Sequence, residues 1–340
     1  MSVTPLEPAR ITLSRELKGW SQAELARQVD VSPGAISQFE SGTTRPGSEV
    51  LAKIALALEV PPAFLGLTVV QTHEGFFRSL RRTSVSDRRK ARALAYVAHD
   101  FATSQFAIDH LPTTDLPFLS LEDLNAPEEK LEEIAGDVRR HWHLPRGPVR
   151  SLVSLLEDKG VIVFRLPLES SDVDAFSLPF ADRPVVVLCS DKDDRARSRF
   201  DAAHELGHLV MHGQTIWGLK EVEAQAHAFA AAFLMPKRDI ERELPDRLDW
   251  PRFFDLKRKW QVSIAALVRR AKTLGHMSPS QYQAAMKEIS ARGWRRVEPV
   301  PLGAPESPNA LRTLITAKGA SLVTRQLPSW VIESFEWESP

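Results

Sequence analysis

The chain has one cysteine, Cys189, among its 340 residues. A single cysteine excludes an internal disulfide and a cysteine-based zinc finger, and it fits a reducing compartment. Cys189 lies at the end of the apolar run PVVVLCS, where we expect a small buried side chain. A cysteine or serine nucleophile has no support either, because Cys189 has no histidine nearby in the sequence and no Gly-x-Ser-x-Gly motif is present.

Long hydrophobic runs are also missing. No apolar stretch approaches the ~20 residues that cross a bilayer. The first residues, MSVTPLEPAR, lack the basic and apolar regions of a secretory signal. We therefore expect a cytoplasmic protein with no membrane partner.

The chain has no net charge overall, but its charged residues are unevenly distributed. The formal net charge is zero, yet residues 76–92 hold seven basic residues and one acid. Such a run either contacts phosphate or forms a solvated helix face, and the sequence leaves both interpretations open.

Helical patterns dominate the chain, and its length favours two or three domains. Strand patterns appear only in the middle, as short β-branched segments bounded by turn residues at 160–168, 173–179 and 184–190. The expected fold class is therefore mainly α with a small β-sheet (α+β).

Two short helices after Ser21 have the proportions of a helix-turn-helix. Ser21 and Glu24 form a capping box for the first of them. Ser32 is the N-cap of the second, and Pro33 occupies its first helical position, where the missing N–H costs nothing. Flanking helices are expected over PARITLSREL and SEVLAKIALAL.

Residues 9–66 resemble the phage-repressor (XRE, Cro-like) helix-turn-helix family through SQAELA, VSPGAISQFESG, the proline of TTRPG and LAKIALALEV. The resemblance implies that double-stranded operator DNA is a partner. Phosphate contacts would come from Gln22 and Arg45, and the remaining implied DNA-binding positions are Ser32, Pro33, Gly34, Ser37 and Gln38. Pro33-Gly34 replaces the long polar side chains that often begin this helix in the family. The alternative is a helix-turn-helix used for protein contacts.

Residues 201–213, DAAHELGHLVMHG, carry the pattern His-Glu-x-x-His. His204 and His208 share a helix face at i and i+4, so both can offer ring nitrogens to one zinc ion. Glu205 lies about 100° round the helix, placed to reach a metal-bound water rather than the metal. Zinc lowers the pKa of that water to ~7, and Glu205 can then take its proton during attack on a peptide carbonyl. Gly207 leaves room for a close neighbour.

A second helix is predicted over residues 221–236 and supplies a third ligand. Its many alanines allow a close approach to the first helix. Glu221 and Glu223 lie about 200° apart on a helix, and Glu223 shares the small, apolar side that should pack on the histidine helix. Glu223 is therefore the expected third ligand. The alternative is an ordinary helix with two surface histidines and a salt-bridging glutamate.

The segments RSRFDAAHELGHLVMHG, EAQAHAFAAAFLMP and LKRKWQVSIAALVRRAKTLGHMS resemble the ImmA/IrrE family of zinc metallopeptidases. The similarity spans about residues 130–300 and includes the DAFS strand and the Glu298-Pro299 pair. It implies a zincin-like domain with a Zn²⁺ cofactor and a protein substrate, commonly a helix-turn-helix repressor. His212 and His227 are candidates for the cleft or for contacts behind the ligands. His227 stands where the family often has asparagine or aspartate.

Together these patterns predict four segments: a DNA-binding domain (9–66), a helical connector (67–129), a metallopeptidase-like domain (130–300) and a tail (301–340). The leading hypothesis is a DNA-binding regulator with a zinc peptidase domain. One alternative makes that domain a non-catalytic sensor or dimerisation module, and another makes the helix-turn-helix only a recruiter for a peptidase. The sequence also leaves open whether a second copy of the chain is a partner, in a homodimer.

Overall fold

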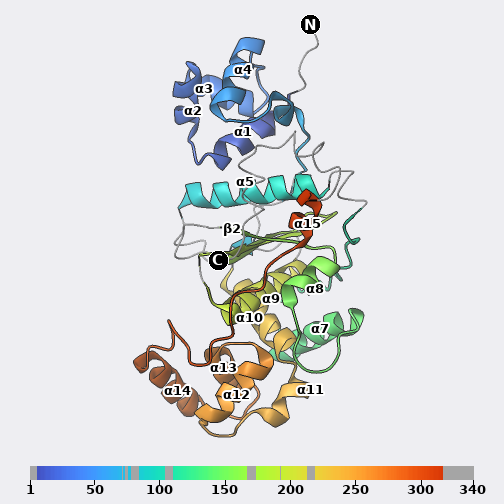
Figure 1. The fold of residues 1–340 in the computed structure, drawn as a ribbon, viewed down its shortest axis with the longest axis vertical. Helices are drawn as coiled ribbons and strands as arrows, with labels where there is room; N and C mark the ends of the chain where they lie inside the picture. Colours follow the sequence, from blue (N-terminus) through green and yellow to red (C-terminus); the bar gives the residue numbers. More distant parts are fainter. Residues whose placement is uncertain are drawn as a thin grey trace.

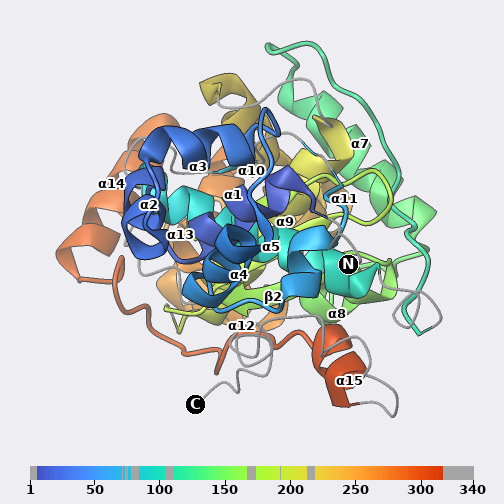
Figure 2. The same ribbon diagram turned by 90° about the horizontal axis from the view of Figure 1, so that it is seen from above.

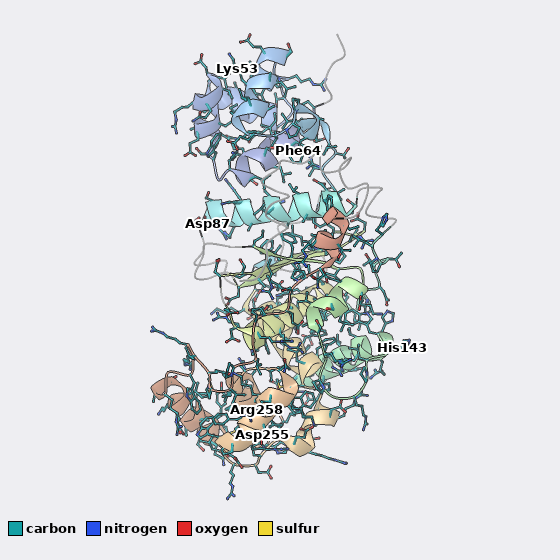
Figure 3. The ribbon with its side chains drawn as sticks, in the orientation of Figure 1. Lys53, Phe64, Asp87, His143, Asp255 and Arg258 are labelled. Carbon is teal, nitrogen blue, oxygen red and sulfur yellow. The ribbon has the colours of Figure 1, made fainter. Side chains whose placement is uncertain are left out.

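The computed structural model describes residues 6–70, 72, 76–77, 84–103, 110–166, 174–191, 193–212 and 219–316. These parts are stacked along one long axis (Figure 1). Lys53 lies near one end of the molecule, and Asp255 and Arg258 lie near the other (Figure 3). The predicted fold class, mainly α with a small β-sheet, is confirmed.

The N-terminal end is a bundle of short helices. Its elements are α1 (Pro8–Leu17), α2 (Gln22–Val29), α3 (Pro33–Glu40), α4 (Ser48–Ala57) and the 3-10 helix η1 (Pro62–Gly66). The predicted capping box at Ser21 and Glu24 is present, and the Ser32 side chain accepts a hydrogen bond from the Ala35 N–H. Local capping therefore sets where α2 and α3 begin, as the sequence predicts.

A mixed sheet lies in the middle of the molecule, in the strand order β1-β3-β4-β2. Its strands are β1 (Phe76–Phe77), β2 (Ile162–Leu166), β3 (Ala175–Leu178) and β4 (Val185–Cys189). β2 pairs with β4 in parallel, whereas β3 is antiparallel to both β4 and β1. Three strands confirm the prediction. The expectation that strands occur only in the middle of the sequence is wrong, because β1 comes from the connector after the bundle.

Helices cover both faces of the sheet (Figure 1). On one face, α5 (Val85–Ala102) packs against β2 and β4 and also against α1 of the bundle. Arg10 is buried at this junction, where it donates to the carbonyl of Leu67 and pairs with Asp100 of α5. The connector therefore joins the bundle to the sheet. Part of its basic run, residues 78–83, lies outside the described residues.

The two helices that carry the predicted metal ligands lie on the other side: α9 (Arg195–Met211) packs against β3 and β4, and α10 (Lys220–Leu234) packs on α9. Further helices surround them and extend to the far end of the molecule. These are α7 (Glu128–His141), α8 (Leu152–Asp158), α11 (Lys237–Ile240), η2 (Glu241–Glu243), α12 (Trp250–Trp260), α13 (Ile264–Thr273) and α14 (Pro279–Ala291).

The chain after α14 runs along the outside of the molecule to α15 (Ala310–Thr316), which packs on β2 (Figures 1 and 2). Glu298 accepts a hydrogen bond from the Ile264 N–H at the start of α13. Glu306 forms a buried ion pair with Arg199 of α9. These carboxylates therefore hold the chain after α14 against α13 and α9. In the described part of the chain, no helix is long and apolar enough to span a membrane.

Candidate metal centre and DNA-binding face

Three side chains from α9 and α10 converge behind the sheet. His204 and His208 occupy one face of α9, and Glu223 extends from the first turn of α10. The Nε2 atoms of the two histidines are 3.1 Å apart, and Glu223 oxygens lie 3.2 Å from His204 Nε2 and 3.4 Å from His208 Nε2. A tetrahedral zinc ion with bonds of ~2.0 Å places its ligand atoms ~3.3 Å apart. The spacing of this donor set therefore fits zinc.

The charge state of Glu223 also suits a metal ligand. Burial opposes ionisation of this carboxyl, but the adjacent His204 and His208 side chains outweigh that effect and hold its pKa well below the usual range. Two imidazoles and one carboxylate form a donor set that zinc binds readily.

Gly207 allows α10 to approach α9 closely. A Cβ atom at Gly207 would lie 2.9 Å from Cδ1 of Phe229 and 3.3 Å from Cα of Ala226. Both distances are shorter than an ordinary carbon–carbon contact. The expectation that Gly207 makes room for a close neighbour is confirmed, and that neighbour is the helix that carries Glu223.

Glu205 faces the sheet rather than α10. Its Oε2 atom accepts a hydrogen bond of 2.7 Å from the hydroxyl of Ser177 in β3, and both residues are buried. The proposed base therefore lies beside the ligands but on a different side of α9, as its position in the helix predicts. Ser177 belongs to the DAFS segment, yet the sequence did not identify it as a partner of Glu205.

A chain of hydrogen bonds lies behind His208. Gln225 Nε2 donates to the carbonyl of Asp123 (2.7 Å), so Gln225 Oε1 faces His212 Nε2 (3.1 Å) as the acceptor. His212 then carries its proton on Nε2, and its Nδ1 accepts from His208 Nδ1 (3.0 Å). This order leaves the lone pair of His208 Nε2 directed toward His204 and Glu223, as a metal ligand requires.

Neutral His212 is consistent with this network. Burial, with the nearby His208, lowers the pKa of His212 to about 4. The sequence suggested that His212 could line the cleft, whereas the structure places it in contact with the far nitrogen of His208. Gln225 was missed, although a single amide in an alanine-rich helix, two residues after Glu223, was a usable signal.

His227 does not join the three donor atoms. Its Nε2 accepts a hydrogen bond from Arg269 of α13 (3.1 Å), and its ring centre is 6.5 Å from that of His204. Phe200, His227 and Arg269 line two adjoining cavities of about 270 and 380 Å³. Glu221 is exposed and borders the smaller cavity, one half-turn from Glu223.

The predicted DNA-binding residues lie on the surface of the bundle. Exposed residues occur at the start and outer face of α3 and in the turn after it, at Ser32, Pro33, Gly34, Ser37, Gln38 and Arg45. Gln22 is half-buried, and its Nε2 donates to Glu40 (2.8 Å), which is also paired with Arg15. The structure therefore groups the α3 positions and Arg45 on open surface, while Gln22 lies at the edge of the core.

Comparison with known protein families assigns the helical bundle and the region of the metal centre to two different families. Residues 13–65 match the family model described as helix-turn-helix. Residues 156–272 match a peptidase family model described as the IrrE N-terminal-like domain, and this region contains His204, Glu205, His208 and Glu223. No curated protein matches the chain. The boundaries predicted at residues 66, 129 and 300 stay predictions. The resemblance stated from the sequence is confirmed: the chain joins an XRE-type helix-turn-helix DNA-binding domain to an IrrE-like domain of a peptidase family.

Proposed function

We propose that this chain is a DNA-binding regulator that hydrolyses peptide bonds in a regulatory protein at a zinc site formed by His204, His208 and Glu223. The observation that carries the proposal is the 3.1–3.4 Å spacing among the Nε2 atoms of His204 and His208 and the two carboxylate oxygens of Glu223, with Glu205 on the helix of the histidines. The match of this region to a peptidase family supports it. The same ligands also bind manganese or iron, so the proposal names zinc among several divalent metals that these side chains can hold.

Zinc bound at this site would supply Lewis acidity, which lowers the pKa of its water to ~7 and polarises a peptide carbonyl. Glu205 takes the proton of the attacking water and delivers it to the amine that leaves. Ser177 holds the Glu205 carboxylate by the 2.7 Å hydrogen bond. His212 and Gln225 keep His208 in the tautomer and orientation that direct its Nε2 inward.

The bundle would bind operator DNA through the exposed face of α3. Ser37 and Gln38 point away from the core and are free of the packing that fixes the buried residues of the bundle. Arg45, exposed in the turn after α3, is placed to contact phosphate. A homodimer on a two-fold symmetric operator is part of the proposal. By resemblance, the protein substrate would be a helix-turn-helix repressor.

The test combines metal binding with hydrolysis. The purified chain is titrated with zinc, and cleavage of unfolded casein and of purified helix-turn-helix repressors is followed with and without chelator. We expect one tightly bound zinc ion per chain and cleavage that the chelator abolishes. Zinc binding without any cleavage would instead support the sensor function.

A further inference from the structure

β1 occupies the edge of the sheet next to the proposed base. β3 has β4 on one side and β1 on the other. Ser177 of β3 contacts Glu205 through its hydroxyl and pairs with Phe76 of β1 through its backbone. Residues directly opposite each other in antiparallel strands have Cα atoms ~4.5–5.5 Å apart. The backbone of Phe76 is therefore held beside the β3 residue that positions Glu205.

This edge is where an extended substrate would bind. A strand edge offers unpaired N–H and C=O groups that align a peptide by strand addition. β3 is the strand that lies nearest to Glu205, and its outer edge is paired with Phe76–Phe77. A peptide from another protein would have to displace β1 before it could pair with β3.

Four of the side chains at the site are closed to solvent, whereas the side chain of Glu223 is 26% exposed. His204 and Glu205 are each 1% exposed, and His208 and Ser177 are 0% exposed. A peptidase must admit a peptide backbone to these groups. Glu205 is therefore covered on the side that faces β3, and β1 is the extended segment that pairs with the outer edge of β3.

We propose that the substrate of the site is this chain itself, cut in cis at the Phe76–Phe77 peptide bond. The inference rests on the proposed function, since it uses the same ligands and base. One water is consumed: its oxygen bonds to the carbonyl carbon of Phe76, the C–N bond breaks, and the nitrogen of Phe77 leaves as an amine with the proton that Glu205 carries. The products are residues 1–76, which contain the DNA-binding bundle, and residues 77–340.

Cleavage at this position would change a covalent link into a non-covalent one. After the cut, the bundle would be held to the remainder by contacts such as the Arg10–Asp100 ion pair and the packing of α1 on α5. The operator-binding fragment could then dissociate, so the reaction would couple the metal site to the occupancy of DNA.

The experiment incubates the full-length chain with zinc and identifies fragments by intact-mass spectrometry. We expect a fragment that ends at Phe76. Its first-order rate constant should not depend on protein concentration, because the reaction is unimolecular. Glu205→Gln should stay intact. Phe77→Leu should still be cut, whereas Phe77→Pro should stay intact, because proline removes the backbone N–H at the bond that breaks.

A second readout does not depend on catalysis. In the Glu205→Gln background, hydrogen exchange of the peptide covering residues 174–180 is compared between chains with Phe77 and with Phe77→Pro. We expect faster exchange in the proline chain if β1 protects the edge of β3, and unchanged exchange would overturn the proposal.

Casein separates this proposal from the proposed function. A wild-type chain that stays intact, while zinc-loaded Phe77→Pro digests unfolded casein, would overturn the self-cleavage and leave the peptidase function standing, with β1 as an inhibitor. Cleavage at another bond, or an apparent first-order rate constant that rises with protein concentration, would also overturn it. If neither the chain itself nor casein is cut by either zinc-loaded protein, the proposed function itself fails.

Discussion

The substitution Gly207→Ala tests whether the close approach of α9 and α10 sets the metal site. The added Cβ would lie 2.9 Å from Cδ1 of Phe229, whereas carbon atoms pack at ~3.5 Å or more. Because Phe229 is fully buried, its ring and the helix that carries it must shift by up to ~0.6 Å near this point. Glu223 moves with α10, while His204 and His208 stay on α9, so the spacing of the donor atoms changes.

The expected effect on zinc is larger than the effect on stability. Alanine gains ~1 kcal/mol of helix propensity over glycine, but overpacking a core costs ~1–3 kcal/mol, which leaves a net loss of ~0–2 kcal/mol. Metal–ligand distances tolerate only ~0.2 Å. A shift of ~0.6 Å should therefore weaken zinc binding at least ~10-fold. This is the lower end of the loss in metal affinity that follows when residues that orient metal ligands are mutated.

Zinc affinity is measured by competition with a chromogenic chelator, and stability by thermal unfolding of the metal-free chain. Gly136→Ala in α7 is the matched control, because its Cβ would meet only the movable end of Arg140, at 3.3 Å. Unchanged zinc affinity in Gly207→Ala, with the control also unchanged, would refute the argument that this glycine fixes the ligand spacing.

Three further predictions concern other residues. Glu223→Gln should remove most of the bound zinc and Glu221→Gln little, as metal analysis of the purified variants would show; the reverse result would mean that the wrong face of α10 carries the ligand. Gln22→Ala should weaken binding to all operators alike and Ser37→Arg should change operator preference, and gel shifts that show no change for either variant would contradict the assigned DNA-binding face. Burial raises the pKa of Glu157 from 4.5 to about 7, so the folded chain holds a proton that the unfolded chain releases. The free energy of unfolding should then fall by up to ~1.4 kcal/mol per pH unit between these two pKa values. Glu157→Gln should remove that part of the slope in denaturant titrations from pH 4 to 8, and an unchanged slope would contradict the cause given for the pKa.

The helices of the bundle could be predicted from the sequence because their ends are decided locally. Ser21 and Glu24 cap α2 within one turn, and Ser32 does the same for α3. The pairing of His204 with His208 follows from the helix repeat alone. These features need no knowledge of distant segments.

Features that depend on distant segments could not be predicted in the same way. β1 is only two residues long, and Phe76 is extended because it pairs with Ser177, about a hundred residues later in the chain. A two-residue strand has no periodicity to detect. The hydrogen bonds of Gln225 with His212 and Asp123 likewise depend on how α10 packs against α9 and on a backbone carbonyl, which residue types do not reveal.

The most direct test of the central claim compares wild-type protein with Glu205→Gln at equal zinc occupancy. The amide cannot accept the proton of the attacking water, so the rate of peptide-bond hydrolysis should fall by ~10²–10⁴-fold while zinc content and thermal unfolding stay unchanged. Hydrolysis is followed by mass spectrometry, on the chain itself and on unfolded casein. Hydrolysis at the wild-type rate by zinc-loaded Glu205→Gln would contradict the account.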